Sequence, residues 1–213
     1  MLTLFDYLPS QNAWKVRQLF KYLATPHQTK IIRIFAGEGQ SDSYRAINPW
    51  GAVPAVRFDD GRVLSESSAI LCHFARETSY LPADAFEQSK VLQWLSFEAD
   101  YVQTSVGSLR YWTLTGKLAS RSADLIEGKR ATAYRALSIL DRQFADHPFI
   151  TGDRYTIADI ALFAYAHLAA EAELDTAHLP NFTNWTQRVR AQPAFLSEMH
   201  PYSIDPLASQ ELP

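Results

Sequence analysis

The sequence predicts two parts of different class: a mixed α/β part over residues 1–78 and an all-helical part over residues 87–213, joined by a linker at 79–86. Three observations predict this division. Two short apolar runs flank a helical pattern near the N-terminus, which is typical of a βαβ unit. A hairpin pattern follows them. Beyond the linker, every apolar pattern has helical spacing.

The first part is inferred from alternating strand and helix patterns. The expected elements are a strand at 2–5, a helix at 13–23, strands at 31–35, 55–58 and 62–64, and a helix from Ala69. In the first helix one face is apolar, while Lys15, Arg17 and Lys21 fall on other faces. Strands joined by a helix run parallel and strands joined by a tight turn run antiparallel, so the sheet should be mixed.

The second part consists of amphipathic helix patterns. These are expected at residues 91–114 (with a bend near Gly107), 123–145, 157–170 and 181–190. The third has the clearest start signal, because Thr156 and Asp159 have the spacing of a reciprocal capping box. That helix is apolar almost all round, which predicts the buried centre of this part.

Composition excludes several classes of protein. The chain has 213 residues, 47% of them hydrophobic and 20% charged, with a net charge of −3, so neither nucleic acid nor a membrane is an expected partner. No apolar run approaches the roughly 20 residues that span a bilayer. The first residues lack the features of an export signal, and Cys72 as the single cysteine excludes an internal disulfide, so we expect a cytoplasmic protein. The six histidines form no i, i+4 pair, so no metal site is expected.

Two kinds of recognition are predicted close together around the hairpin. Pro54 keeps Val53 extended, so the main chain of Val53 can pair with an extended, peptide-like ligand. After the hairpin, residues 65–68 give the first turn of the next helix several hydroxyls and a carboxylate. Helix N-termini suit carboxylates, while Glu66 could receive an ammonium group. The alternative is an ordinary hairpin followed by a serine-capped helix.

Four motifs in order carry a family resemblance: Asn48-Pro-x-Gly-x-Val-Pro54, Glu66-Ser67, Thr156-x-x-Asp159, and Pro180-x-x-x-x-Trp185 through Phe195. With them the chain resembles a cytosolic glutathione S-transferase of bacterial type over nearly its whole length. The resemblance implies a thioredoxin-like N-terminal domain, an all-helical C-terminal domain, a homodimer, and glutathione as the bound co-substrate.

The resemblance also implies roles for individual residues. For glutathione binding these are Val53, Pro54, Glu66 and Ser67, with Gln40 or Arg45 on the glycyl carboxylate. The main chain of Val53 would bind the cysteinyl part, next to a proline that is cis in the family. Glu66 and Ser67 would bind the γ-glutamyl group.

Three residues of the first loop are candidates for activating the glutathione thiol. Ser10 resembles the hydroxyl donor of serine-type classes, and Asn12 resembles an asparagine that accompanies such a donor in disulfide-reducing relatives. Tyr7 stands where tyrosine-type classes place their donor. Each also has a structural alternative: Ser10 as a helix cap, Asn12 as a turn residue and Tyr7 as packed core.

The second substrate is expected against the long helix after the linker, where Tyr101, Arg110 and Trp112 are candidates. A core or surface role for each is the alternative. The favoured reaction is attack of the bound thiolate on an electrophilic carbon. The competing hypotheses are thiol–disulfide exchange and a non-catalytic binding module that keeps the fold.

Overall fold

The structure, a computed structural model, describes residues 1–212 and contains two compact units. The first comprises residues 1–74 together with 196–212, and the second comprises Ala75–Phe195. The first unit is α/β and the second is helical, as the sequence predicts. Residues 196–212 group with the α/β unit, whereas the sequence patterns assigned them to the helical part.

The first unit is built on a four-stranded mixed sheet in the order β2-β1-β3-β4. The strands are β1 (Leu2–Asp6), β2 (His27–Ile31), β3 (Ala55–Arg57) and β4 (Val63–Ser65). β1 and β2 run parallel, and the other two pairs are antiparallel, so the predicted mixed sheet is confirmed.

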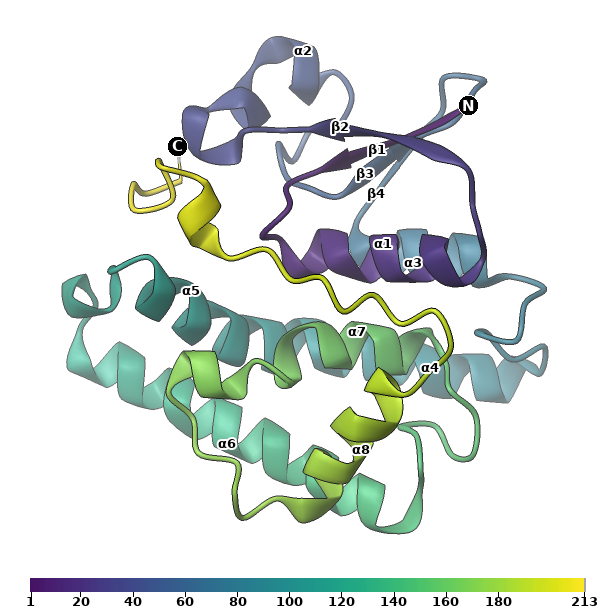
Figure 1. The fold of residues 1–213 in the computed structure, drawn as a ribbon, viewed down its shortest axis with the longest axis vertical. Helices are drawn as coiled ribbons and strands as arrows, with labels where there is room; N and C mark the ends of the chain where they lie inside the picture. Colours follow the sequence, from purple (N-terminus) through teal and green to yellow (C-terminus); the bar gives the residue numbers. More distant parts are fainter. Residues whose placement is uncertain (213) are drawn as a thin grey trace. The chain divides into compact units, whose positions relative to one another are not determined.

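Both faces of this sheet are covered because side chains alternate along each strand. Leu4 and Val56 pack on one face against helices α1 (Gln11–Tyr22) and α3 (Ser67–Ala75) (Figure 1). Phe5 and Ala55 pack on the other face, where short helix α2 (Asp42–Arg45) lies. The central strands β1 and β3 are therefore buried over most of their length, and the loops emerge at the ends of the sheet.

The position of β2 differs from the prediction. The strand covers residues 27–31, and the apolar run at 31–35 instead leads into a 3₁₀ turn at Ile34–Ala36. β2 is an edge strand that exposes most of its residues, so it has no apolar signal of its own. The apolar run that suggested a strand comes from Ile32 and Phe35, which lie after β2 and are buried in the core.

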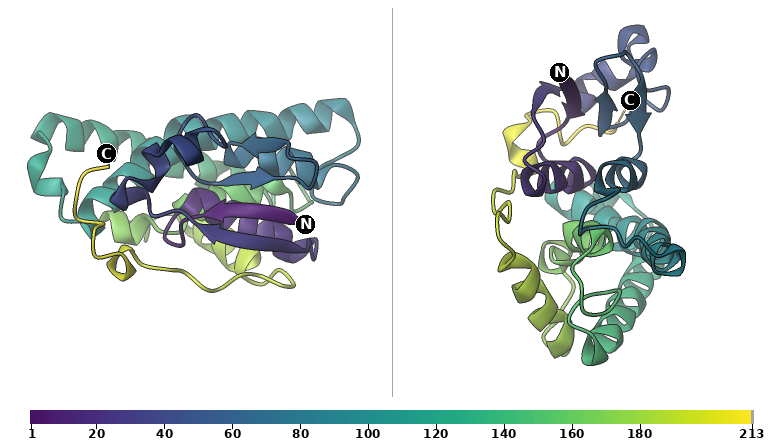
Figure 2. Two further views of the ribbon diagram at one scale, coloured as in Figure 1. Left: turned by 90° about the horizontal axis from the view of Figure 1, so that it is seen from above. Right: turned by 90° about the vertical axis from the view of Figure 1, so that its right-hand side faces the viewer.

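The second unit contains helices joined by short turns. They are α4 (Ala85–Phe97), a π-helical segment (Glu98–Gly107), α5 (Ser108–Leu114), α6 (Ala123–Asp146), α7 (Ile157–Ala166) and α8 (Pro180–Arg190). Helix α6 packs against the π-helical segment and α8 (Figure 2). Asp84 caps α4, so this helix begins inside the predicted linker. No helix within residues 1–212 has the length and apolar character needed to cross a membrane.

Asp159 organises the centre of this unit. The predicted capping box is confirmed: Thr156 caps α7, and the carboxylate of Asp159 accepts the Thr156 amide at 3.0 Å. The same buried carboxylate accepts the Ile150 amide at 2.9 Å and the indole N–H of Trp185 at 3.0 Å. One side chain therefore joins the preceding loop, α7 and α8.

The buried Asp159 predicts a pH dependence of stability. Burial raises its pKa from 3.8 to about 6, although the hydrogen bonds it accepts act in the opposite direction. A carboxyl with a raised pKa in the folded state contributes stability below its unfolded pKa, and this contribution is lost as the pH rises through the folded pKa. Relative to Asp159→Asn, we expect the unfolding free energy of the parent to fall by up to about 3 kcal/mol from pH 4 to pH 7.

Urea denaturation followed by tryptophan fluorescence at several pH values measures this difference. The variant will be less stable throughout, because its amide nitrogen faces groups that donate hydrogen bonds. The raised pKa of Asp159 is therefore tested by how the difference in unfolding free energy between parent and variant changes with pH, and not by the size of that difference. A parent that gains stability over the variant as the pH rises would contradict the raised pKa.

Candidate functional site

The sheet register brings three predicted segments to one edge. Phe5 of β1 lies opposite Ala55 of β3, and Ala55 lies opposite Ser65 of β4. Because both pairs are antiparallel, the loop after β1, the residues before β3 and the residues after β4 all emerge at this edge. Ser10, Val53 and Glu66 follow or precede these strand ends by a few residues. The three predicted segments therefore lie at the same edge of the sheet, and their role in binding stays a prediction.

A pocket of about 300 Å³ lies at this edge. Its lining residues are Ser10, Ile34, Gly39, Gln40, Trp50, Gly51, Ala52, Val53 and Leu212. It brings together three residues that the sequence singles out: Ser10, Gln40 and Val53. Glu66 and Ser67 follow the adjacent strand β4 and are not among the lining residues.

Ser10 stands at the N-terminus of α1. Its Oγ accepts a hydrogen bond from the Ala13 amide at 3.2 Å, so the side chain caps the helix. Capping uses the hydroxyl as an acceptor and leaves its proton to be donated to another group. The capping role and a role as donor to a ligand are therefore compatible.

An ion pair fixes the loop that carries Ser10. Arg17 Nη1 lies 2.7 and 2.8 Å from the two carboxylate oxygens of Asp6, and Nη2 donates to the Leu8 carbonyl at 2.9 Å. The Asp6 side chain is fully buried and that of Arg17 is 14% exposed. The sequence pattern placed Arg17 on a polar face, but the guanidinium ties the end of β1, the loop and α1 together.

Asn12 and Lys15 form a second contact in α1. Lys15 Nζ donates to Asn12 Oδ1 at 2.8 Å, and Lys15 is completely buried. The helical pattern placed Lys15 outside the apolar face of α1, and the structure nevertheless buries it. Asn12 therefore has a charged partner rather than the role of an ordinary turn residue.

The main chain of Val53 forms no hydrogen bond among residues 1–212, whereas the residue before it is fixed by two. The Tyr44 hydroxyl and Asn48 Nδ2 donate to the Ala52 carbonyl at 2.7 and 2.8 Å. Burial raises the pKa of Tyr44 to about 12, so its hydroxyl keeps the proton that it donates. The following Val53–Pro54 peptide bond is cis. Val53 lines the pocket, so its main chain is a candidate for pairing with an extended ligand.

Two glycines set the shape of the pocket wall. A Cβ atom on Gly51 would lie 2.6 Å from the Gly39 carbonyl oxygen and 2.9 Å from Gln40 Nε2. Gly51 also has a φ of +67°, which is unfavourable for residues with side chains. The loop before Val53 therefore packs directly on the backbone of the segment that carries Gln40.

Glu66 has an uncommon backbone conformation. Its φ is +70°, in the left-handed region, and its carbonyl accepts the Ile70 amide at 2.9 Å in the first turn of α3. Non-glycine residues in this region cost free energy and concentrate at functional sites. Ser67 begins α3 and is only 7% exposed.

Gln40 and Arg45, the two candidates for a glycyl carboxylate, lie together. Arg45 Nη2 donates to Gln40 Oε1 at 2.5 Å. Because the amide oxygen is engaged by Arg45, the amide nitrogen of Gln40 and the remaining guanidinium N–H groups are donors suited to an anion. The structure thus joins two candidates that sequence reasoning left as alternatives.

The residues predicted for the second substrate lie in the helical unit. Tyr101 is 47% exposed and its ring lies 5.2 Å from that of Phe97. Arg110 is 3% exposed and pairs with Glu171 at 2.6 Å, so its charge is already neutralised. The Arg121 guanidinium lies 5.3 Å from the Trp112 ring. Their role in substrate binding stays a prediction.

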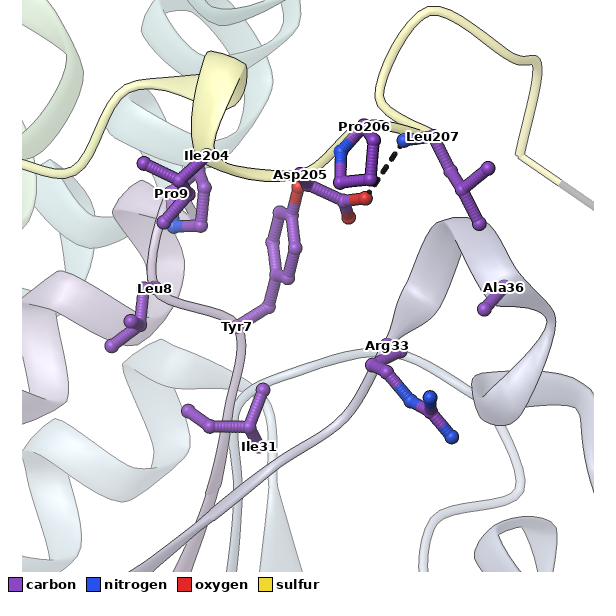
Figure 3. A pocket seen from close by; sticks show the side chains of 10 residues that line it. All are labelled: Tyr7, Leu8, Pro9, Ile31, Arg33, Ala36, Ile204, Asp205, Pro206 and Leu207. Carbon is purple, nitrogen blue, oxygen red and sulfur yellow. Dashed lines mark hydrogen bonds between the residues drawn. The ribbon is translucent and has the colours of Figure 1, made fainter.

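Sequence reasoning missed a second pocket in the first unit, of about 330 Å³. The Tyr7–Pro9 loop forms one wall and Ile204–Leu207 of the C-terminal tail forms another (Figure 3). Tyr7 is 4% exposed, and its ring points toward Asp205 (Figure 3). These walls are about 200 residues apart in the chain, so no local pattern could indicate the pocket. Within residues 1–212, no three His, Cys, Asp or Glu side chains converge as a metal site would require.

Comparisons with known proteins agree with this architecture. Residues 9–77 match the family model "Glutathione S-transferase, N-terminal domain", and residues 94–193 match "Glutathione S-transferase, C-terminal domain". A crystal structure of a glutathione S-transferase from Xanthobacter autotrophicus superposes with a TM-score of 0.89 at 31% identity, covering 96% of this chain and 99% of that one.

Two further relatives are named for different activities, one as a disulfide-bond oxidoreductase and one as a glutathione transferase. The disulfide-bond oxidoreductase YfcG of Escherichia coli is 26% identical over 88% of this chain and 90% of its own. A glutathione transferase from Burkholderia graminis, solved with two glutathione molecules per subunit, is 26% identical with a TM-score of 0.80, covering 91% of this chain and 85% of that one. The chain therefore belongs to the glutathione S-transferase family and has its fold, an α/β N-terminal domain followed by a helical one.

Proposed function

We propose that the protein binds glutathione in the pocket that Ser10, Gln40 and Val53 line, and that it activates the bound thiol for attack on an electrophilic carbon. One observation carries the proposal: the unpaired main chain of Val53 opens into the same pocket as the Ser10 hydroxyl cap. A peptide-like thiol paired with Val53 would place its sulfur toward the N-terminus of α1. Relatives named as glutathione transferases support the same ligand.

The two charged ends of glutathione have suitable partners on either side of Val53. The γ-glutamyl group would lie at the start of α3, where Glu66 can receive the ammonium and Ser67, with the helix N-terminus, the carboxylate. The glycyl carboxylate would meet the donors of Gln40 and Arg45. In this binding mode, five residues have the roles that the family resemblance implies: Val53, Pro54, Glu66, Ser67 and Gln40.

Ser10 is the proposed donor to the thiolate. A cysteine-like thiol has a pKa of about 8.5, and lowering it by two units needs on the order of 2.7 kcal/mol of preferential thiolate stabilisation. A hydroxyl donor and the positive end of α1 act together at this position. Because the Ala13 amide fixes the Ser10 oxygen, the hydroxyl proton can be directed at the sulfur without rearranging the loop.

Thiol–disulfide exchange is the second candidate reaction. Here the thiolate attacks one sulfur of a disulfide, a new sulfur–sulfur bond forms, and the other sulfur leaves as a thiolate. The fixed position of Asn12 beside Ser10 favours this reaction, because a second donor could stabilise the leaving sulfur. The relation to a disulfide-bond oxidoreductase supports it.

The second substrate would bind next to the same loop. The pocket around Tyr7 is mainly apolar, with Leu8, Pro9 and Ile204 in its walls and Arg33 among its lining residues (Figure 3). It suits an apolar electrophile or disulfide. A contribution of Tyr101, Arg110 and Trp112 to binding the second substrate stays a prediction from the sequence. The family relation and the single cysteine support a cytoplasmic homodimer.

Calorimetric titration with glutathione tests the binding proposal. Side-by-side assays with a chloronitrobenzene and with hydroxyethyl disulfide then separate conjugation from disulfide exchange. Binding of glutathione without turnover in either assay would favour the non-catalytic module. Lack of binding at millimolar glutathione would overturn the proposal.

Replacing Ser10 separates its two roles. Ser10→Ala should raise the pKa of the bound thiol and lower kcat/KM by roughly 10- to 100-fold at neutral pH, because a hydrogen bond to a charged acceptor is lost. Ser122 caps α6 in the same way and is the matched control. Both variants should lose about 1 kcal/mol of stability. If Ser122→Ala and Ser10→Ala have the same activity, Ser10 is only a cap.

Replacing Glu66 tests recognition of the ammonium group. Glu66→Gln should weaken glutathione binding about tenfold in calorimetry, because a charge-assisted hydrogen bond becomes a neutral one. Glu77→Gln is the control, since Glu77 shares the left-handed conformation with a φ of +60° but lies in the other unit. Equal affinities for the two variants would remove Glu66 from the site.

The contact between Gly51 and Gly39 can be tested in the same assay. Gly51→Ala should weaken glutathione binding and destabilise the first unit by more than 1 kcal/mol, because its Cβ meets backbone at 2.6 Å. Gly61→Ala is the control. Gly61 has a similar φ of +88°, but a Cβ there would meet nothing within 4 Å, so this variant has the conformational penalty without the steric clash. If the two variants have the same urea-denaturation midpoint and the same affinity for glutathione, the contact between Gly51 and Gly39 contributes to neither stability nor binding.

A further inference from the structure

Lys15 is a buried cation that the proposed chemistry does not yet use. It lies in α1, one and a half turns after Ser10, and its exposed fraction is 0%. Burying an ammonium group costs several kcal/mol, and its buried partners return this cost only in part. Its presence in the helix that carries the site therefore suggests a functional role.

The contact with Asn12 has a defined polarity. Lys15 Nζ lies 2.8 Å from Asn12 Oδ1. An ammonium group only donates hydrogen bonds, so the amide must turn its oxygen toward Lys15. The reversed amide would place two donors against each other. Lys15 thus fixes the Asn12 amide in one of its two orientations, with the NH₂ group on the other side.

We propose that Lys15 is a positioning residue for the thiol: it holds Asn12 so that the Asn12 amide N–H, and not its carbonyl, is presented to the sulfur of glutathione. This inference rests on the proposed function, because it concerns the sulfur of the bound tripeptide. A thiolate accepts hydrogen bonds, so only the NH₂ side of the amide stabilises it. An Asn12 that could rotate would present its oxygen part of the time and repel the anion.

The position of Asn12 agrees with this role. Asn12 is the second residue of α1 and follows Ser10 and Gln11. In this first turn the backbone N–H groups have no acceptor within the helix and point out of its N-terminal end. A side-chain N–H at this place adds to the hydroxyl of Ser10 and to the positive end of the helix. All three are donors or positive potentials, and none requires a metal or a charged residue in contact with the sulfur.

The test is a double-mutant cycle with Asn12→Ala and Lys15→Met, measured on the full chain. The readouts are glutathione affinity, the pKa of the bound thiol from its ultraviolet absorbance, and urea stability. Lys15→Met should raise the thiol pKa by about one unit and lower kcat/KM about tenfold at neutral pH, with little loss at high pH. Its stability should fall, because the Asn12 side-chain oxygen loses its buried partner, and the urea measurement separates this loss from the change in thiol pKa.

Coupling between the two residues decides the inference. In the Asn12→Ala background, Lys15→Met should have almost no further effect on the thiol pKa, while Lys15→Arg should retain part of the parent behaviour. Lys21→Met changes an exposed lysine of the same helix and is the control. A full, additive shift in the Asn12→Ala background, or an unchanged pKa in Lys15→Met, would overturn the inference alone. A parent that does not bind glutathione would overturn the proposed function as well.

Discussion

The ion pair between Arg17 and Asp6 is the constraint on which the site depends. It joins the end of β1 to the middle of α1, and its third hydrogen bond holds the carbonyl of Leu8 in the loop between them. A guanidinium binds a carboxylate with two parallel hydrogen bonds, so it restrains direction as well as distance. With Asp6 fully buried, loss of either partner would leave a charge without compensation. The position of Ser10 at the start of α1 therefore depends on this ion pair.

The proposed site consists mainly of backbone groups. Val53 offers main-chain groups, and α1 and α3 offer helix N-termini, all at one edge of the sheet. Backbone groups cannot move independently of the fold, so their positions are set once the strands are in register. In the proposed function, Ser10 would add a hydroxyl donor at the positive end of α1, whereas Glu66 would add selectivity for an ammonium group near the start of α3.

Local signals were predictable from sequence, and contacts between distant segments were not. The capping box at Thr156 and the hairpin before Glu66 are each contained in a few residues, so their patterns were sufficient. β2 was displaced because an edge strand needs no apolar run. The burial of Lys15 was missed because helical periodicity describes one helix, while burial depends on everything packed around it. The walls of the pocket at Tyr7 were missed for the same reason.

The C-terminal tail has a consequence for how this protein becomes functional during synthesis. Gln18 of α1 accepts the amide of Leu196 at 2.7 Å, and tail residues complete both pockets, Leu212 in one and Ile204 in the other. Chains emerge from the ribosome N-terminus first. The α/β domain can form its sheet early, but its binding surfaces remain incomplete until residues 196–212 have been synthesised, and these follow the whole helical unit in the sequence. Ligand capture should therefore begin only after the helical domain has been synthesised.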